Sequence, residues 1–544
     1  MSLMGSLYIG SSGLRTSQNA LNTTAHNMAN VNTPGYVRQI VQQSTRSFNT
    51  ISINGSAIAP QQLGLGVVYS ETKTQRDVFL DRAFRKESGR SAFYEVSTQT
   101  LEEIDNLFQE LDGEAFAKSL TNLWNAIQDL ANEPDQASRQ SVFVQRAYEF
   151  LLRADSVYQG LADYQDNINA SISKDIDRIN EIGHSIRQLN EQIRRIEAGK
   201  MENANDLRNI RDRLLDELSS LADVSYFYDA FGNMNVRIEG NDFVKMDSVN
   251  EIALHVDTLT GFYTPYWRDL ATTYIDIFGE EQINIDSARV FNLTQTISSE
   301  MNTDIGAVKA KMLARGTHRA TYQDIAVSDP RHDEFDPDRA GHYDQNISQS
   351  IIMNMQAQFD QLVNKVVEGI NNILRDAALS DPNGMYMRDS YGNVLQLFNK
   401  MGDDGPFTVQ NTIINADLRQ APTLLGFRLA DGQTDYGTAQ RLKELFDNKD
   451  HTLNPNVQTR VNLAGYYNAM ISQVANSGSV YRAISDNQRL TVEQIEAARE
   501  MVIGVSTDEE LSFMIQFQNA FNASSRYINV ISEMLEHIIT RLGR

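Results

Sequence analysis

Residues 168–196 read INASISKDIDRINEIGHSIRQLNEQIRRI, and apolar side chains recur through this stretch at steps of three or four residues. The recurring positions are Ile168, Ile172, Ile176, Ile179, Ile182, Ile186, Leu189, Ile193 and Ile196. Such spacing gives an apolar seam along one side of a long helix, and a partner must cover that seam. A second series after Gly199 predicts the partner helix, at Leu207, Ile210, Leu214, Leu218 and Leu221. The middle of the chain is therefore predicted to be a helical bundle.

The apolar pattern changes from helical to strand-like after Ala222. Apolar side chains then alternate on both sides of Phe231-Gly232-Asn233, at Val224, Tyr226, Tyr228, Met234, Val236 and Ile238. Alternation around a turn that contains glycine predicts a β-hairpin. Tyr386–Leu429 is also punctuated by turn residues and predicts further short strands. Helical periodicity covers most of the remainder, at 93–130, 138–161, 291–313, 347–379, 438–446 and 458–500.

These patterns are nested along the chain, so we predict a mainly α fold with β-rich insertions. Terminal helices form an antiparallel coiled coil and enclose a long-helix bundle domain, which carries inserted β domains. The expected segments are an N-terminal axial helix and turn (1–36), an extended connector (37–90), a helical bundle domain (91–223), a β-rich insertion (224–290), a helical segment with an acidic loop (291–379), a second β-rich insertion (380–436), the returning helices of the bundle (437–504) and a C-terminal axial helix (505–544).

Both ends of the chain carry a seven-residue apolar repeat. The N-terminal repeat is at Leu7, Leu14, Leu21 and Met28. The C-terminal repeat is at Met514, Phe521, Ile528, Leu535 and Leu542, with Phe517, Ile531 and Ile538 at the companion position and Ser524 as the polar exception. Each repeat could belong to an ordinary amphipathic helix packed on a domain core. Because helices of about 30 residues are marginal alone, we instead expect the two ends to pair, opposite one another, and to leave apolar surface for other subunits.

The N-terminal helix is predicted to end at Asn30-Val31-Asn32-Thr33-Pro34-Gly35-Tyr36. Pro34 and Gly35 suit the two central positions of a type II turn. The turn motif consists of Asn32, Thr33, Pro34, Gly35 and Tyr36.

The C-terminal helix has an equally clear predicted start. Ser506 or Thr507 can cap it, and the acidic residues 508–510 place negative charge where the helix dipole favours it. Thr507 and Glu510 also fit a capping box.

The composition limits the classes of protein to consider. The 544 residues include 48 Lys and Arg and 71 Asp and Glu, so the formal net charge is −23 at pH 7. A surface this anionic repels phosphate backbones and anionic lipids, so we expect no nucleic-acid and no membrane partner. The absence of cysteine excludes disulfides and thiolate metal sites. We find no apolar run long enough to span a bilayer and no cleaved export signal at the start.

Histidine and acidic residues cluster densely in one place only, at His318, His332, Asp333, Asp336, Asp338 and His342. This cluster could be a metal or acid–base site, or it could be a hydrated acidic linker. We favour the linker, because the spacing fits neither a zinc template nor an EF-hand template. No catalytic or nucleotide-binding motif is present. We therefore predict no catalytic residue, no metal site and no cofactor.

Two stretches carry a family resemblance. Ala29–Tyr36, after a Leu-rich helix, resembles the signature of the bacterial flagellar rod, hook and hook-associated proteins. Gly504–Leu511, continuing to Gln518–Arg526, resembles the C-terminal helix of the same axial proteins. The stretch Trp124–Pro134 resembles the helical domain of the junction type within this family.

This resemblance implies a structural, non-enzymatic subunit of the bacterial flagellum at the junction between hook and filament. It implies head-to-tail self-association in a ring or short helical array, with the hook protein and a second junction protein next to the filament as neighbours. It further implies an extracellular protein, exported unfolded through the type III apparatus, with an export chaperone on the C-terminal helix. We expect the ends to be largely disordered before assembly. The expected assembly residues are Leu7, Leu14, Leu21, Met28, Met514, Phe521, Ile528 and Leu535.

Two alternatives remain open from the sequence. A hook-type subunit would form long polymers when purified. A secreted axial protein with an adhesive or enzymatic insertion domain would bind a surface ligand without its ends, or would bind zinc or calcium through His332 and Asp336.

Overall fold

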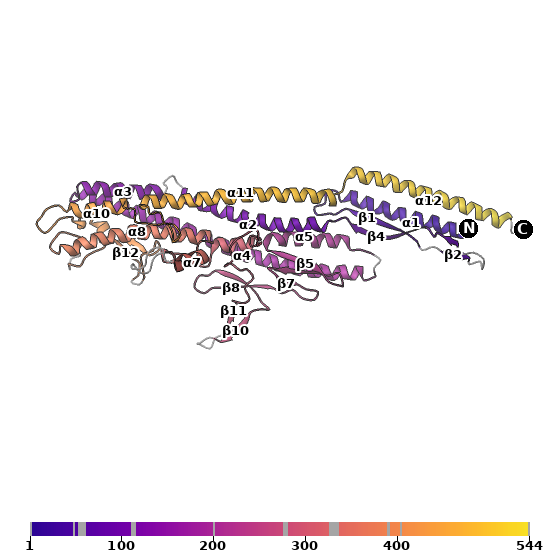
Figure 1. Cartoon of the computed structure of the whole chain (residues 1–544), viewed down its shortest axis with the longest axis horizontal. Coiled ribbons are helices and arrows are strands. Elements are labelled where there is room, and N and C mark those ends of the chain that lie inside the picture. The colour runs from indigo at the N-terminus through magenta and orange to yellow at the C-terminus, as the bar shows by residue number, and fades with distance from the viewer. Residues whose placement is uncertain are drawn as a thin grey trace. The chain divides into compact units, whose positions relative to one another are not determined.

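The computed structural model describes residues 3–46, 49–52, 61–109, 116–199, 202–275, 281–325, 337–388, 392–402 and 405–541. The fold is mainly α-helical, as predicted, and its strands form small sheets (Figure 1). The α-helices are α1 (Leu3–Ala29), α2 (Val78–Gln109), α3 (Phe116–Asn132), α4 (Ala137–Glu197), α5 (Asn205–Leu221), α6 (Ala307–Arg315), α7 (Pro337–Asn346), α8 (Ile351–Ser380), α9 (Ala416–Gln420), α10 (Tyr436–Asp447), α11 (Leu463–Ile503) and α12 (Thr507–Arg541). Two short 3₁₀ helices, η1 (Tyr322–Asp324) and η2 (Pro422–Leu425), accompany them.

The strands pair antiparallel in every sheet described here. They are β1 (Gln39–Thr45), β2 (Asn49–Ser52), β3 (Gln61–Leu63), β4 (Val67–Thr74), β5 (Val224–Tyr228), β6 (Met234–Ile238), β7 (Asn241–Val244), β8 (Ile252–Val256), β9 (Tyr263–Trp267), β10 (Thr272–Ile275), β11 (Glu281–Asn284), β12 (Phe398–Lys400) and β13 (Thr412–Ile414). The larger sheet has the order β5-β6-β7, and the others are two-stranded.

The chain divides into two compact units, each built from separated stretches of sequence. Unit 1 comprises Met1–Gly89, Arg178–Glu251 and Gln488–Arg544. Unit 2 comprises Arg90–Asp177 and Ile252–Asn487. Helices α2, α4 and α11 each contribute residues to both units.

The core of unit 1 contains α4, α5 and the three-stranded sheet. The predicted seam of α4 is confirmed, because all its apolar residues are buried except Ile196. Gly183 lies in this seam where β7 approaches α4 most closely. A Cβ atom at Gly183 would lie 2.8 Å from Cε1 of Phe243, so only glycine fits there. The hairpin is also confirmed, with Val224 opposite Ile238 and Tyr228 opposite Met234.

The buried face of α5 differs from the predicted one. Of the predicted apolar series on this helix, only Leu218 is buried. The buried side instead carries Asn205, Asn209, Arg211, Asp212, Leu215, Leu218 and Ser219. Polar groups can occupy a core where partners satisfy them, and Arg211 donates to Oδ1 of Asn190 at 2.7 Å. Hydrophobic periodicity therefore gave the wrong face for this helix.

Unit 2 has an aromatic core. The rings of Phe108, Phe116, Phe150, Phe359 and Tyr467 lie with neighbouring centroids 4.8–6.4 Å apart. Edge-to-face and tilted pairs at such distances add to the free energy gained from burial. These residues come from α2, α3, α4, α8 and α11, so the cluster joins helices that are distant in sequence.

Two predicted boundaries differ in the structure. Residues 291–303 are not helical, and α6 begins only at Ala307. Side chains bind the local backbone there, because Asn292 accepts from the amide of Thr294 at 3.0 Å and Thr303 accepts from that of Ser298 at 2.7 Å. Such bonds compete with a helix. Helix α2 begins at Val78, inside the segment expected to be an extended connector, because Asp77 caps it by accepting from the amide of Phe79.

A buried carboxylate in unit 2 makes stability depend on pH. Asp360 on α8 accepts hydrogen bonds from the amides of Tyr322 at 2.8 Å and Val409 at 2.6 Å. Burial raises the pKa of Asp360 to about 6, an effect that the two amides oppose and the charge of Asp324 assists. The folded state thus retains a proton that the unfolded chain loses near pH 4, so this group destabilises the fold as the pH rises towards 6.

Asp360→Asn should remove that pH dependence. Relative to the original chain, the variant should gain about 2–3 kcal/mol in unfolding free energy of unit 2 between pH 4 and pH 7. Asparagine has one oxygen acceptor fewer for the two amides, which lowers the unfolding free energy of the variant by the same amount at every pH. The informative quantity is therefore how the difference in unfolding free energy between the variant and the original chain changes with pH. Urea unfolding at several pH values measures it, and a difference that stays constant from pH 4 to pH 7 contradicts the prediction.

Candidate assembly interface

The two terminal helices pack against each other antiparallel in unit 1 (Figure 1). Gly10 of α1 lies against Ile528 and Tyr527 of α12, whereas Gly13 lies against Ser524. A Cβ atom at Gly10 would lie 2.7 Å from Cγ1 of Ile528, and one at Gly13 would lie 2.8 Å from Oγ of Ser524. Larger residues at these two positions would therefore force the helices apart.

The side of α1 that faces α12 is lined by small residues instead of the predicted leucines. They are spaced by three and four residues, at Ser6, Gly10, Gly13, Ser17, Ala20, Thr24 and Asn27. Leu7, Leu14, Leu21 and Met28 each follow one of these by one residue and so lie about 100° around the helix. All four are half-buried. Small side chains let the helices approach closely, which leaves the leucine row at the edge of the contact.

The α12 side of the pair follows the predicted repeat. Ile531 is buried, and the residues in register with it are half-buried, at Met514, Phe517, Phe521, Ser524, Ile528 and Leu535. Ile538 is exposed, and Leu542 lies outside the described residues. The pairing therefore places bulky side chains of α12 against small ones of α1.

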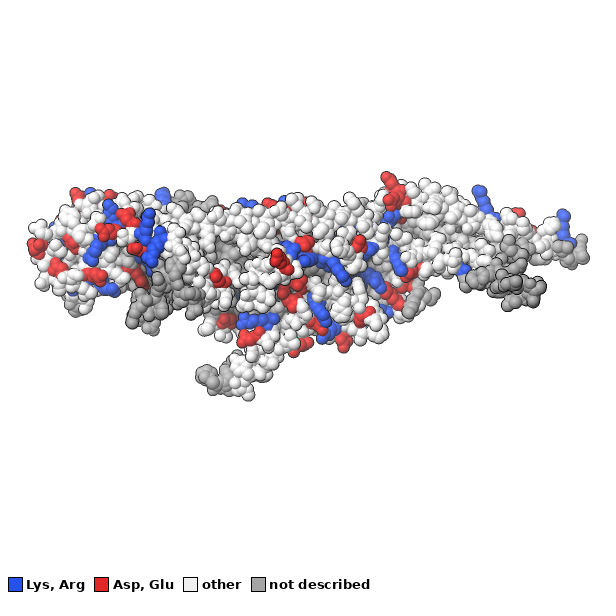
Figure 2. All heavy atoms as spheres, viewed as in Figure 1, with Lys and Arg blue, Asp and Glu red and all other residues white. Residues whose placement is uncertain are grey.

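Much apolar surface remains exposed on this helix pair. The exposed large side chains are Met4 and Tyr8 on α1, and Leu511, Phe513, Ile515, Tyr527, Val530, Met534, Ile538 and Ile539 on α12. Between Glu510 and Glu533 the only charged residue is Arg526. Figure 2 accordingly shows few charged side chains on the visible face of α12 after the acidic group at its start. Apolar exposure on this scale marks interaction surfaces.

The turn motif has the predicted conformation. Tyr36 donates its amide to the carbonyl of Thr33 at 3.1 Å, and Gly35 has φ +75°, which glycine adopts without strain. Asn32, Thr33, Pro34 and Gly35 are exposed, whereas Tyr36 is half-buried. Burial, followed by the charges of Asp206 and Glu510, raises the pKa of Tyr36. The tyrosine therefore stays neutral and can donate a hydrogen bond.

Asn27 connects the turn to both terminal helices, and sequence reasoning missed it. Its Oδ1 accepts from the hydroxyl of Tyr36 at 2.7 Å and the amide of Gln39 at 3.0 Å. Its Nδ2 donates to the carbonyl of Gln39 at 2.9 Å and to Glu510 at 3.1 Å. All four hydrogen bonds that a carboxamide can make are thus formed. No hydrophobic pattern could have indicated this residue.

Glu510 was predicted to close a capping box with Thr507, and the structure assigns it a different role. The cap is Ser506, whose Oγ accepts from the amide of Glu509 at 3.5 Å. The buried carboxylate of Glu510 instead accepts from Nε of Arg38 at 2.8 Å and from Asn27. Arg38 also pairs with Glu509, and its amide donates to the carbonyl of Ile503. Long-range contacts of Glu510 with Arg38 and Asn27 thus take the place of the predicted capping box.

The antiparallel ribbon of β1 and β4 covers a further side of α1. The amide of Val67 donates to Oγ of Ser12 at 3.3 Å. Gly66, with φ +88°, passes the backbone of Ile9 so closely that a Cβ atom would lie 3.2 Å from its Cα. The ribbon therefore fixes α1 from a second direction.

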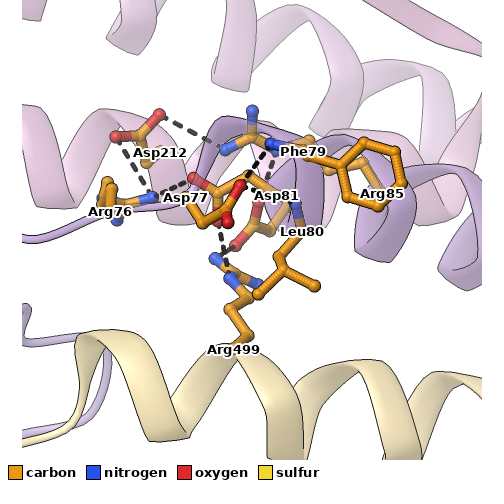
Figure 3. A network of polar contacts seen from close by, with 9 residues as sticks. Arg76, Asp77, Phe79, Leu80, Asp81, Arg85, Asp212 and Arg499 are labelled. Atoms are coloured by element: carbon orange, nitrogen blue, oxygen red, sulfur yellow. Dashed lines mark hydrogen bonds and ion pairs between the residues drawn. The ribbon is translucent and has the colours of Figure 1, made fainter.

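A buried group of three arginines and three aspartates, which we call the anchor cluster, joins α2, α5 and α11 within unit 1 (Figure 3). It consists of Arg76, Asp81, Arg85, Asp212, Asp216 and Arg499. Arg499 lies 2.7 Å from Asp81 and 2.5 Å from Asp216. Arg85 lies 2.6 Å from Asp216 and 3.3 Å from Asp212. Burial lowers the pKa of Arg85, but these two carboxylates outweigh it, so the pKa lies above its ordinary value.

Most of the acidic loop lies outside the described residues, so the absence of a metal site there stays a prediction. His332, Asp333 and Asp336 lie outside the described residues, and so does the side chain of Asp338. Nε2 of His318 lies 3.2 Å from Oδ1 of Asp324, and His342 is exposed on α7. Among the described residues, no group of three or more His, Asp and Glu side chains could hold a metal ion. Within the same ranges, no helix has the length and apolar character required to cross a membrane.

Three family models match separate parts of the chain. Residues 7–36 match the flagella basal body rod protein, and residues 503–541 match the C-terminal part of the flagellar basal body rod FlgEFG proteins. Residues 101–273 match the helical domain of flagellar hook-associated protein FlgK. The two end matches cover α1 with its turn and α12, which are the elements that pair in the structure.

Known proteins resemble the chain over nearly its full length. Flagellar hook-associated protein 1 of Bacillus subtilis is 25% identical over 97% of this chain and 96% of that protein. The Escherichia coli protein of the same name is 22% identical over 97% and 98%. The solved structure of the flagellar hook junction protein FlgK from Burkholderia pseudomallei has a TM-score of 0.51 at 13% identity, covering 79% of this chain and 100% of that one, and so shares the fold.

The paired terminal helices and the turn motif lie in the segments that match structural axial proteins of the bacterial flagellum, so the chain is similar to this class at both ends. This class is structural and not enzymatic. Within that class, the chain resembles flagellar hook-associated protein 1, the hook junction protein, over nearly its full length.

Proposed function

We propose that this chain is the structural subunit between hook and filament, and that it assembles head to tail through the α1–α12 pair. The observation that carries the proposal is the apolar surface left on that pair after the two helices have covered each other. In a head-to-tail array one surface meets a different surface on the next copy, which generates a ring or short helix. The apolar residues of α12 and the row Leu7, Leu14, Leu21 and Met28 supply that surface.

The neighbours in the assembly are the hook protein on one side and the second junction protein on the other. The chain reaches this place by type III export and is extracellular in the flagellum. An export chaperone covers α12 before assembly, because that helix would otherwise expose Phe513, Val530 and Met534 to solvent. The exposed turn motif contributes a rigid corner to the contact between copies.

Moving side-chain volume from Ile528 to Gly10 by substitution tests whether the α1–α12 pair is required for assembly of the junction. Gly10→Val adds three carbons where a single Cβ atom already meets Ile528, so we expect junctions to be lost and filaments to detach. Adding Ile528→Ala removes three carbons at the same contact and should restore attachment at least in part. Electron microscopy of hooks from cells that carry each variant gives the readout.

Gly64→Val is the matched control, because nothing lies within 4 Å of the position that its Cβ atom would occupy. This variant should assemble normally. Normal junctions built by Gly10→Val would contradict the proposal.

A further inference from the structure

The carboxamide of Asn27 contacts three elements of unit 1 at once. Its Nδ2 donates to the carbonyl of Gln39 at 2.9 Å, and its Oδ1 accepts from the amide of the same residue at 3.0 Å. The other hydrogen of Nδ2 bonds to the carboxylate of Glu510, and Oδ1 also accepts from the hydroxyl of Tyr36. One side chain of α1 therefore joins the start of α12, the end of the turn motif and the first residue of β1.

The four hydrogen bonds of Asn27 depend on one another. Glu510 is the charged acceptor among its partners, and charge-assisted hydrogen bonds are the stronger ones. A carboxamide turned end for end would point Oδ1 at this carboxylate, so Glu510 stabilises the orientation in which Oδ1 accepts from Tyr36. Asn27 is 1% exposed and Glu510 is 2% exposed, and hydrogen bonds that share one group strengthen one another where water is excluded.

Arg38, which follows the turn motif, makes a second connection to α12. Its guanidinium pairs with Glu509 and Glu510 and lies over the ring of Phe513, with 5.5 Å between Cζ and the ring centroid. Its amide donates to the carbonyl of Ile503, directly before α12, at 2.9 Å. Release of α12 would therefore remove the three contacts that hold the side chain of Arg38.

The turn motif itself is mostly exposed. Asn32, Thr33, Pro34 and Gly35 face solvent, and the amide of Tyr36 closes the turn by donating to the carbonyl of Thr33 at 3.1 Å. Segments with exposed backbone hydrogen bonds and few buried contacts open readily. The order of the motif therefore depends on the buried contact between Tyr36 and Asn27 at its end.

We propose that docking of α12 on α1 orders the turn motif, and that Asn27 transmits this effect through its hydrogen bond to Glu510. Coupling between two sites is reciprocal, so an ordered turn favours the docking of α12 by the same factor. A copy then presents a rigid turn to its neighbours only after its own terminal helices have paired. This consequence for assembly rests on the proposed function, whereas the coupling is a property of the single chain.

An engineered disulfide, which we call the clamp, can hold α12 on α1 in the full chain. The sequence contains no cysteine, and a Cβ atom at Gly13 would lie 3.7 Å from Cβ of Ser524. Disulfides place these two atoms about 3.8 Å apart, so Gly13→Cys with Ser524→Cys should form the clamp on oxidation. The clamp lies about 21 Å along α1 from Asn27, so its effect on the turn must be transmitted through the helix pair.

Hydrogen exchange at the amides of Tyr36 and Gln39 measures the order of the turn in the isolated clamped chain. Glu510→Ala should make these amides exchange at least about tenfold faster, because the clamped helix then lacks its hydrogen bond to Asn27. Glu509→Ala is the matched control, since it removes the neighbouring carboxylate, which pairs with Arg38 and is 60% exposed. The control should change exchange by less than about twofold.

Reduction of the clamp tests the same coupling without a substitution at Asn27 or Glu510. Exchange in the turn should follow exchange in α12, so both should be slow in the oxidised chain and both should speed up together if α12 is released on reduction. A turn that stays protected while α12 exchanges freely would overturn the proposal. An unprotected turn in the oxidised chain, or equal effects of Glu510→Ala and Glu509→Ala, would overturn it as well.

The failure of this inference can be distinguished from the failure of the proposed function, because exchange is measured on the isolated chain and junctions are observed on cells. If Gly10→Val prevents junctions while the turn is ordered independently of α12, only the coupling fails. If the turn follows α12 but Gly10→Val builds normal junctions, the coupling stands and the proposed function fails.

Discussion

A chain that ends at Val505 is expected to fold but to leave cells with hooks and without filaments. The truncation removes α12, and with it the apolar seam that covers α1 and the exposed surface proposed for neighbouring copies. Unit 2 contains no residue of α12, so its unfolding temperature should not change. Flagellin should be shed into the medium, because it no longer has a junction on which to polymerise.

Electron microscopy of cells and immunoblots of the medium measure this result. Phe521→Asp combined with Ile528→Asp should have the same effect with less disruption, because a carboxylate in an apolar contact must remain solvated. A chain that retains α12 but ends at Arg541 is the matched control, since it keeps the whole described helix. Truncated chains that still hold filaments would show that the interface lies elsewhere.

Arg499→Leu is expected to destabilise unit 1 by about 3–5 kcal/mol, which is the cost of leaving a buried ion pair without one partner. Buried Asp81 and half-buried Asp216 would each lose one guanidinium contact, which leaves three carboxylates of the anchor cluster to share Arg76 and Arg85. The packing of Arg499 over the ring of Phe84, at 4.5 Å, would be lost as well. Urea unfolding, followed by hydrogen exchange at the backbone amides of α5, shows whether the loss of unfolding free energy occurs in unit 1.

Arg482→Leu on the same helix is the control. Its partner is Glu102, and the two side chains are 59% and 49% exposed, so removal of the pair should cost less than about 1 kcal/mol. Equal destabilisation by the two substitutions would show that burial does not set the strength of the anchor cluster.

The sequence predicted best where bulky apolar residues decide the structure. The seam of α4, the repeat of α12 and the hairpin around Gly232 all follow from periodicity, because one face of each element must be buried. The turn at Pro34-Gly35 followed from conformational preference alone.

The sequence predicted poorly where small or polar residues decide it. The row from Ser6 to Asn27 escaped notice because glycine, serine and alanine contribute little to a hydrophobic pattern, and the leucines beside them dominate it. A search for small residues spaced by three and four positions would have found this series. On α5 the apolar series gave the wrong buried face, and the prediction did not consider Asp212 and Asp216, which are four residues apart and so lie on one side of the helix.

The terminal helices carry few charged residues where they pair, which determines how their pairing responds to dissolved salt. Screening by dissolved salt acts on ions, and α12 carries only Arg526 between Glu510 and Glu533, whereas α1 carries only Arg15 among Lys, Arg, Asp and Glu. At the start of α12, buried Glu510 pairs with half-buried Arg38, and this ion pair is shielded from most of the solvent. We therefore expect the pairing of α1 and α12 to depend little on salt concentration.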